Sequence, residues 1–136
     1  MDSAILDSDM LSELLKRRNA VVLQKAAAYL QQFGQFAFSA VTRFEIVRGY
    51  KELSATAQLA RFSVFCQKSL IMPVTDPVWE RAADLWAYAR QHGHPHGDAD
   101  ILIAATSLDC GRRLVTGNKS HFDWIAGLNL DNWRAP

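Results

Sequence analysis

The stretch ILDSDMLSELL, residues 5–15, changes from a strand pattern to a helix pattern at an aspartate. Residues 3–7, SAILD, predict a short buried strand, and the apolar residues from Met10 onward recur at helical spacing. The Asp7 carboxylate would then lie directly after a strand and before a helix. In open α/β sheets ligands bind outside the carboxyl ends of the strands, so an acid stands where a functional site is expected.

The rest of the chain repeats this alternation of strands and helices. Further strands are predicted at 35–40, 70–74, 113–118 and 128–133, further helices at 20–32, 42–55, about 56–68, 76–93 and 99–111, and a short helical turn at 121–125. Ser39 or Thr42 is expected to cap the third helix, and Asp76 to cap the fifth, with Pro77 in its first turn. The pattern predicts one α/β domain over residues 1–136, with three α/β/α layers around a central, mostly parallel sheet of four to five strands.

Composition is that of a soluble globular domain. The chain has 136 residues, of which 49% are hydrophobic and 21% are charged, and its net charge of +1 creates no overall attraction for a polyanion. No apolar run reaches the roughly 20 residues of a membrane span, and the N-terminus lacks the basic start of a signal peptide. Cys66 and Cys110 follow no disulfide or metal-site spacing and are expected to be buried thiols. We therefore expect a cytoplasmic protein without a membrane partner.

Acidic and polar side chains recur close to the ends of the predicted strands. They are Asp7, Asp9, Glu45, Asp98, Asp100 and Asn118. Right-handed crossovers bring these segments toward one crevice. Because clustered carboxylates raise one another's pKa unless a cation is present, the cluster predicts a hard divalent ion, Mg²⁺ or Mn²⁺, of the kind that activates water against a phosphodiester. The alternative is that Asp9, Asp98 and Asp100 are only helix caps.

Four blocks of the chain carry a family pattern. They are ILDSDMLSELL at 5–15, SAVTRFEIVRG at 39–49, HGDADILIAATSL at 96–108 and VTGNKSHFDWIAGLNLDNW at 115–133. In these blocks the chain resembles the PIN-domain family and, within it, the VapC-type toxins of toxin–antitoxin pairs. Members are metal-dependent ribonucleases that a cognate antitoxin holds inactive. The resemblance implies an RNA substrate, a VapB-like antitoxin, a homodimer, and a hetero-oligomer in the complex.

The resemblance also implies a role for each acid. Asp7 takes the place of the first metal-binding aspartate, and Glu45 and Asp100 match the next two acids. Asp98 matches an extra aspartate that only some members have. Asn118 stands where some relatives carry aspartate, and an amide there would orient water or a metal ligand.

Four neighbouring residues have expected supporting roles. Asp9 is expected to orient the metal-binding side chains without binding the ion itself. Ser8 and Thr116 are expected to hydrogen-bond the ligating carboxylates, or else to be turn or cap residues. Arg48 is placed to meet an RNA phosphate or an antitoxin side chain, with simple exposure as the alternative.

The aromatic and histidine residues give weaker signals. His92, His94 and His96 lie in a Gly/Pro-containing loop, and histidines without a fixed scaffold are a poor zinc signal. We expect a solvated loop, with RNA contact or metal capture as alternatives. Trp79 and Trp86 are predicted in the core or on a dimer face.

Two other functions remain open on the sequence. The chain could be a housekeeping RNA-processing PIN nuclease, or a PIN-like domain that binds RNA or protein without cleavage. The presence of Asp7, Glu45 and Asp100 favours catalysis, and the small single domain favours a toxin.

Overall fold

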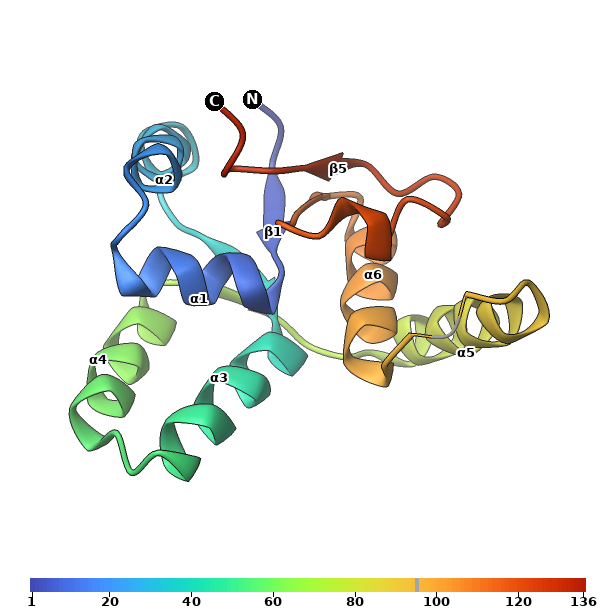
Figure 1. Ribbon diagram of the computed structural model, residues 1–136, viewed down its shortest axis with the longest axis horizontal. Coiled ribbons are helices and arrows are strands. Elements are labelled where there is room, and N and C mark those ends of the chain that lie inside the picture. The colour runs from blue at the N-terminus through green and yellow to red at the C-terminus, as the bar shows by residue number, and fades with distance from the viewer. Residues whose placement is uncertain (95) are drawn as a thin grey trace.

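The sheet is fully parallel, and the strand that precedes Asp7 lies at its centre. The computed structural model describes residues 1–94 and 96–136 (Figure 1). Within these residues the strands are β1 (Ala4–Leu6), β2 (Ala37–Ser39), β3 (Leu70–Met72), β4 (Arg113–Val115) and β5 (Leu130–Asp131). They form one sheet in the order β3-β2-β1-β4-β5, and every pair is parallel. The predicted fold class is confirmed, with the last strand at an edge as expected.

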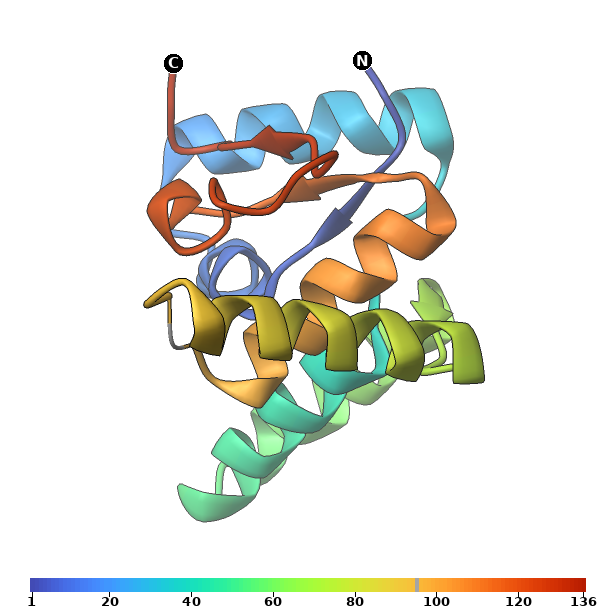
Figure 2. The ribbon, with the colours of Figure 1, turned by 90° about the vertical axis from the view of Figure 1, so that its right-hand side faces the viewer.

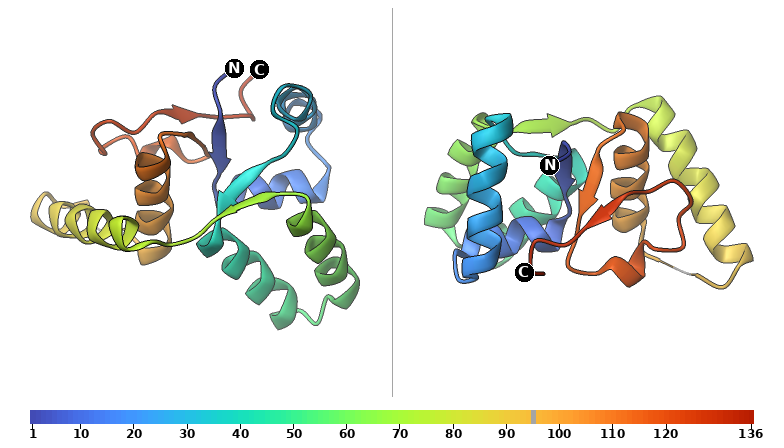
Figure 3. Two further views of the ribbon diagram at one scale, coloured as in Figure 1. Left: turned by 180° about the vertical axis from the view of Figure 1, so that it is seen from behind. Right: turned by 90° about the horizontal axis from the view of Figure 1, so that it is seen from above.

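Helices cover both faces of the sheet. They are α1 (Ser8–Lys16), α2 (Ala20–Phe33), α3 (Ala40–Glu52), α4 (Thr56–Gln67), α5 (Asp76–Gln91) and α6 (Asp98–Cys110). Helices α1, α2 and α4 pack on one face, α6 packs on the other, and α5 lies outside α6 (Figures 2 and 3). A 3-10 turn, η1 (Lys119–His121), follows β4 and begins two residues before the predicted turn.

The buried strands explain why the sequence near β1 is apolar on both sides. Ala4 and Leu6 pack with α1, α2 and α4, whereas Ile5 between them packs with α6. In β4, Val115 and Leu114 divide between the two faces in the same way. Successive side chains point to opposite faces of a strand, so a parallel sheet covered on both sides needs apolar residues throughout.

The N-cap of α3 is one of the two residues expected, and the N-cap of α5 differs from the expected residue. Ser39, not Thr42, caps α3, because its hydroxyl accepts from the Val41 N–H at 3.0 Å. The predicted cap at Asp76 is wrong by one residue, since Thr75 is the N-cap of α5 and Asp76 is the first helical residue. Thr75 makes no side-chain capping bond, and Pro77 in the first turn reduces the need for one because it has no N–H.

Other side chains are less buried than the sequence suggested. Cys66 and Cys110 are free, half-buried thiols, and burial raises the pKa of both. Trp79 and Trp86 are 54% and 42% exposed, so neither belongs to the core. Among the described helices, none combines the length and the apolar character needed to cross a membrane.

Candidate functional site

Asp7 ends β1 and caps α1. Its Oδ1 accepts a hydrogen bond of 2.7 Å from the Met10 N–H, and its own N–H donates to the Val115 carbonyl of β4 at 2.9 Å. The residue is only 4% exposed. The cap of α1 is therefore the same carboxylate that the family resemblance makes a metal ligand, and the fold fixes its position.

The electrostatic surroundings of Asp7 are unfavourable to its charge. Burial raises the pKa of this carboxyl from 3.8 to about 6. Hydrogen bonds from the Thr116 hydroxyl and the Met10 N–H lower the pKa, while the negative charges of Asp9 and Asp100 raise it further. A buried carboxylate that faces two others is the arrangement whose repulsion a cation relieves.

The loop after β4 holds the first turn of α1. The Asn118 side-chain amide donates to Asp9 Oδ2 at 2.7 Å, and the Asn118 N–H donates to Thr116 Oγ1 at 3.0 Å. Thr116 in turn hydrogen-bonds Asp7. Asn118 therefore positions Asp9 directly and Asp7 indirectly, through Thr116.

Glu45 reaches the same region from α3. Ser8 Oγ donates to Glu45 Oε1 at 2.5 Å and lies 3.1 Å from the hydroxyl of Thr42, which is buried. Arg48 Nη2 lies 3.5 Å from Glu45 Oε2, with most of its side chain exposed. Ser8 thus joins α1 to α3 beside Asp7. Sequence reasoning had considered Thr42 only as a cap and missed this contact.

Helix α6 brings one of its two predicted acids to Asp7. Asp100 bears electrostatically on Asp7, and its Oδ2 lies 3.6 Å from His121 Nδ1. Asp98 is exposed at the first residue of α6, and its charge is not among those that shift the pKa of Asp7. The N-caps of α1 and α6 are Asp7 and Gly97, so the alternative that Asp9, Asp98 and Asp100 are caps is wrong.

The donor chemistry fits a hard divalent cation, although the acids are not drawn together around one point. In residues 1–94 and 96–136, no three His, Cys, Asp or Glu side chains lie close enough to hold an ion jointly. Mg²⁺ keeps several of its waters and is usually bound directly by one or two carboxylates. Asp7 with Asp100 supplies that number, whereas neither Glu45 nor Asp98 is among the groups whose charge shifts the pKa of Asp7.

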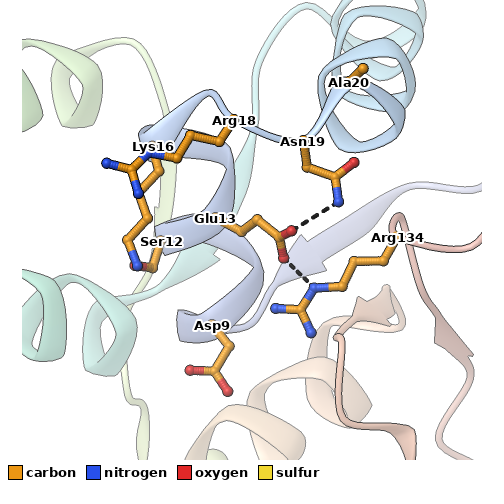
Figure 4. A pocket seen from close by; sticks show the side chains of 8 residues that line it. All are labelled: Asp9, Ser12, Glu13, Lys16, Arg18, Asn19, Ala20 and Arg134. Atoms are coloured by element: carbon orange, nitrogen blue, oxygen red, sulfur yellow. Dashed lines mark hydrogen bonds and ion pairs between the residues drawn. The ribbon is translucent and has the colours of Figure 1, made fainter.

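A hollow of about 640 Å³ adjoins the acids along α1 (Figure 4). Asp9 lies at its edge. Within the hollow, Glu13 accepts hydrogen bonds from Asn19 Nδ2, at 3.0 Å, and from Arg134 Nε. Arg134 reaches Glu13 from the C-terminal segment, as Figure 4 shows. The acid in the middle of α1 is thus paired with a cation.

The same arginine limits the residue at position 117. A Cβ on Gly117 would lie 2.5 Å from Arg134 Cζ, so any other residue would push aside the end of this flexible, partly exposed side chain. Gly117 stands between Thr116 and Asn118, which both act on the acids. The contact between Glu13 and Arg134 joins residues 121 positions apart, and no sequence signal could have found it.

Comparison with known proteins gives consistent matches. The PIN-domain family model matches residues 4–128. Ribonuclease VapC1 of Methanocaldococcus jannaschii is 24% identical over 131 residues, which cover 93% of this chain and 83% of that protein.

Solved structures share the fold over nearly the whole chain. A VapBC2 structure from Rickettsia felis, bound to a promoter DNA fragment, matches with a TM-score of 0.85 at 20% identity, covering 96% of this chain and 98% of that chain. DNA-bound VapBC from Salmonella typhimurium has a TM-score of 0.85 at 21% identity, covering 98% and 99%. FitAcB from Neisseria gonorrhoeae has a TM-score of 0.71 at 25% identity, also covering 98% and 99%.

Proposed function

This chain belongs to the PIN-domain family, and we propose that it is a metal-dependent endoribonuclease toxin of the VapC type, neutralised by a cognate antitoxin in the cytoplasm. The observation that carries the proposal is the buried Asp7, which faces Asp9 and Asp100 at the carboxyl end of the central strand. A protein gains nothing in stability from this repulsion, and a bound Mg²⁺ or Mn²⁺ would remove it. The ribonuclease relative supports RNA as the substrate.

Each acid has a proposed part in the reaction. Asp7 and Asp100 would hold the ion directly, with Glu45 and, more remotely, Asp98 contacting it through water. Such an ion lowers the pKa of a bound water and stabilises charge on the phosphodiester under attack.

The neighbouring side chains would position these acids. Ser8 holds Glu45 beside Asp7, where Glu45 can orient the attacking water and accept its proton. Asn118 fixes Asp9, and Thr116 fixes Asp7. Arg48, beside Glu45 and largely exposed, would contact an RNA phosphate or the antitoxin.

Cleavage of total cellular RNA by the purified chain tests the proposal. With Mg²⁺ or Mn²⁺ the wild type should give discrete fragments, and both EDTA and Asp7→Asn should abolish them. Asp109→Asn is the matched control, because it removes an exposed carboxylate from the opposite end of α6 and should leave cleavage unchanged. If the wild type and Asp7→Asn leave RNA equally intact while both are folded, the domain binds RNA or protein without cutting.

An antitoxin would distinguish the toxin from a housekeeping nuclease. The solved VapBC and FitAcB structures motivate this partner. We place it in an apolar hollow of about 480 Å³ between α1, α2 and α4, lined in part by Leu14, Leu23, Ala27 and Phe65. An amphipathic segment there would lie alongside α1 and could extend a basic side chain toward the acids.

The antitoxin proposal is tested with the product of a neighbouring gene that encodes a small protein. That protein should form a complex with the chain and stop RNA cleavage. Ala27→Glu, at an exposed position of α2 in the hollow, should weaken the complex without reducing cleavage by the free chain. Absence of such a gene, or Ala27→Glu forming an equally tight complex, would contradict the proposed partner or its place.

A homodimer is the proposed oligomeric state. Trp79 and Trp86 present two large exposed rings about two turns apart on α5, and residues of this kind are enriched at the cores of interfaces. Sedimentation should show a dimer that Trp86→Glu dissociates. A monomeric wild type would contradict it.

A further inference from the structure

A strip of neighbouring rings, most of them stacked, leads away from the acids. Its members, which we call the ring strip, are Tyr88, His92, His94, His96, His121 and Trp124. The rings come from the end of α5, the loop after it, and the segment after β4. In Figure 2 the C-terminal end of α5 lies beneath the turn formed by this last segment.

Trp124 is the centre of the strip. Its ring plane is within 7° of those of Tyr88, His94 and His96, at centroid distances of 6.0, 5.7 and 5.4 Å. The His92 ring stacks on that of Tyr88 at a centroid distance of 3.9 Å. His92 and His94 are exposed and His96 is partly buried, and all three imidazoles lie nearly parallel to an aromatic ring.

His121 connects the strip to the candidate active site. Its carbonyl accepts a hydrogen bond of 2.7 Å from Trp124 Nε1, and its Nδ1 lies 3.6 Å from Asp100 Oδ2. The His121 ring is also 5.7 Å from that of His96. A strand of nucleic acid whose scissile phosphodiester lies at the acid cleft would therefore have a neighbouring base within reach of these rings.

Space for a base adjoins the strip. A cavity of about 320 Å³ is lined in part by Tyr88 and Trp124 and by the apolar Leu108 and Ile125, with Arg81 and Asp84 as its charged members. This volume is at the lower end of the range for small-ligand sites. Apolar walls with a few polar groups suit a planar heterocycle whose edge can form hydrogen bonds.

Charge alone would hold RNA poorly at this site. The chain has a net charge of only +1, and the cleft beside the strip carries several carboxylates. Stacking on aromatic rings binds unpaired bases without depending on backbone charge. Stacking on the strip would therefore supply affinity for RNA that the charges of the cleft do not provide.

We propose that the ring strip binds one or two unpaired nucleobases of the RNA, next to the phosphodiester that is cut. This inference rests on the proposed ribonuclease function. It makes single-stranded regions the preferred substrate, because bases inside a duplex cannot lie on the rings.

Binding measurements without cleavage test the strip. The probes are a fluorescent single-stranded RNA 12-mer of mixed sequence and an abasic ribose-phosphate oligomer of the same length, measured by anisotropy in EDTA. Tyr88→Ala, and separately His94→Ala with His96→Ala, should raise the Kd for RNA about tenfold and leave the Kd for the abasic oligomer unchanged. Leu53→Ala removes a large apolar side chain that is 77% exposed at the end of α3, outside the strip, and is the control.

Two outcomes would contradict base binding by the ring strip. If the Kd for RNA is unchanged, the rings only cover Trp124 or serve a protein partner. If both probes lose affinity equally, the effect is not base stacking. Both changes are at half-buried or exposed positions that lie outside the core, and thermal unfolding checks that the variants are folded.

The two proposals fail separately. Cleavage by the wild type, abolished in Asp7→Asn, tests the nuclease, and the Kd comparison needs no cleavage. A chain that cuts RNA but shows no change in Kd keeps its function and loses the strip. A chain that never cuts RNA loses the proposed function, whatever the Kd values are.

Discussion

Asp7 and Glu13 belong to the same end of the molecule, fewer than two helical turns apart along α1, yet their surroundings are opposite. Glu13 has Arg134 and Asn19 as partners. Asp7 is more deeply buried and has Asp9 and Asp100 as charged neighbours, so its pKa is raised to about 6. Glu13, which holds two segments together, is paired with the cationic Arg134. Asp7, which we propose as a metal ligand, has no ion pair with a cation in the part of the chain that the structure describes.

The largest expected difference between the two acids is in cleavage. Asp100→Asn should reduce RNA cleavage at least about hundredfold, because it removes a direct ligand and a charge facing Asp7. Glu13→Gln should change the rate by less than about threefold, since Glu13 only pairs with Arg134. Rates measured on one RNA at saturating Mg²⁺ check both. Equal losses would end the distinction between a ligand acid and a structural acid.

The second difference concerns stability in EDTA. The pKa of Asp7 is higher in the folded chain than in the unfolded chain, so the folded state binds the proton more tightly. Stability is therefore lost as pH rises from about 4 to about 6, and above that range the ionised Asp7 costs roughly 3 kcal/mol. Asp7→Asn keeps an oxygen that can cap α1 without the charge.

Asp7→Asn should thus be more stable than the wild type at pH 7.5, by up to about 3 kcal/mol, and equally stable at pH 3.5. Urea unfolding at the two pH values measures this. Added Mg²⁺ should raise the stability of the wild type and not that of Asp7→Asn, which reports ligand binding without any cleavage assay. A variant that is less stable at both pH values would show that Asp7 serves the fold.

A third test concerns Gly117, which lies against Arg134 and is flanked in the chain by Thr116 and Asn118. Gly117→Ala should displace the Arg134 guanidinium at a cost of about 1 kcal/mol, because the new Cβ meets the far end of a flexible, partly exposed side chain. Because Thr116 and Asn118 flank this position, cleavage should fall as well. Gly117→Ala combined with Arg134→Ala should recover most of both losses, and failure to recover would place the strain elsewhere.

The smallest effect is expected for the pair of Glu13 and Arg134. Both side chains are partly exposed, so a double-mutant cycle of Glu13→Gln and Arg134→Ala should give a coupling of about 1 kcal/mol or less, decreasing with salt. A coupling several times larger would mean that this segment is a principal stabilising contact.

Local patterns predicted most of the fold and named the acids of the candidate site. The strands are apolar because they are buried. Asp7 follows β1, Glu45 follows β2 within α3, and Asp100 lies in the first turn of α6 before β4, at spacings that the family shares. The sequence did not reveal that Asp7 caps α1, because Asp7, Ser8 and Asp9 are all good caps and only the backbone chooses among them. Asp76 was misplaced for the same reason.

Contacts between distant segments were out of reach. The pairing of Arg134 with Glu13 and the stacking of the loop histidines on Trp124 depend on how the last quarter of the chain folds back. Exposed Trp79 and Trp86 show the same limit, since a helix pattern marks one apolar face without saying what covers it.

The position of β1 in the sheet has a consequence for synthesis. This strand is made first, but one of its two neighbours is β4, with Ala4 opposite Arg113. Asp7 therefore meets Thr116 only after most of the chain has left the ribosome, and pairing between such distant strands is slow. A nascent or truncated chain that lacks β4 cannot assemble the acid cleft, so the proposed nuclease would become active only when the chain is nearly complete.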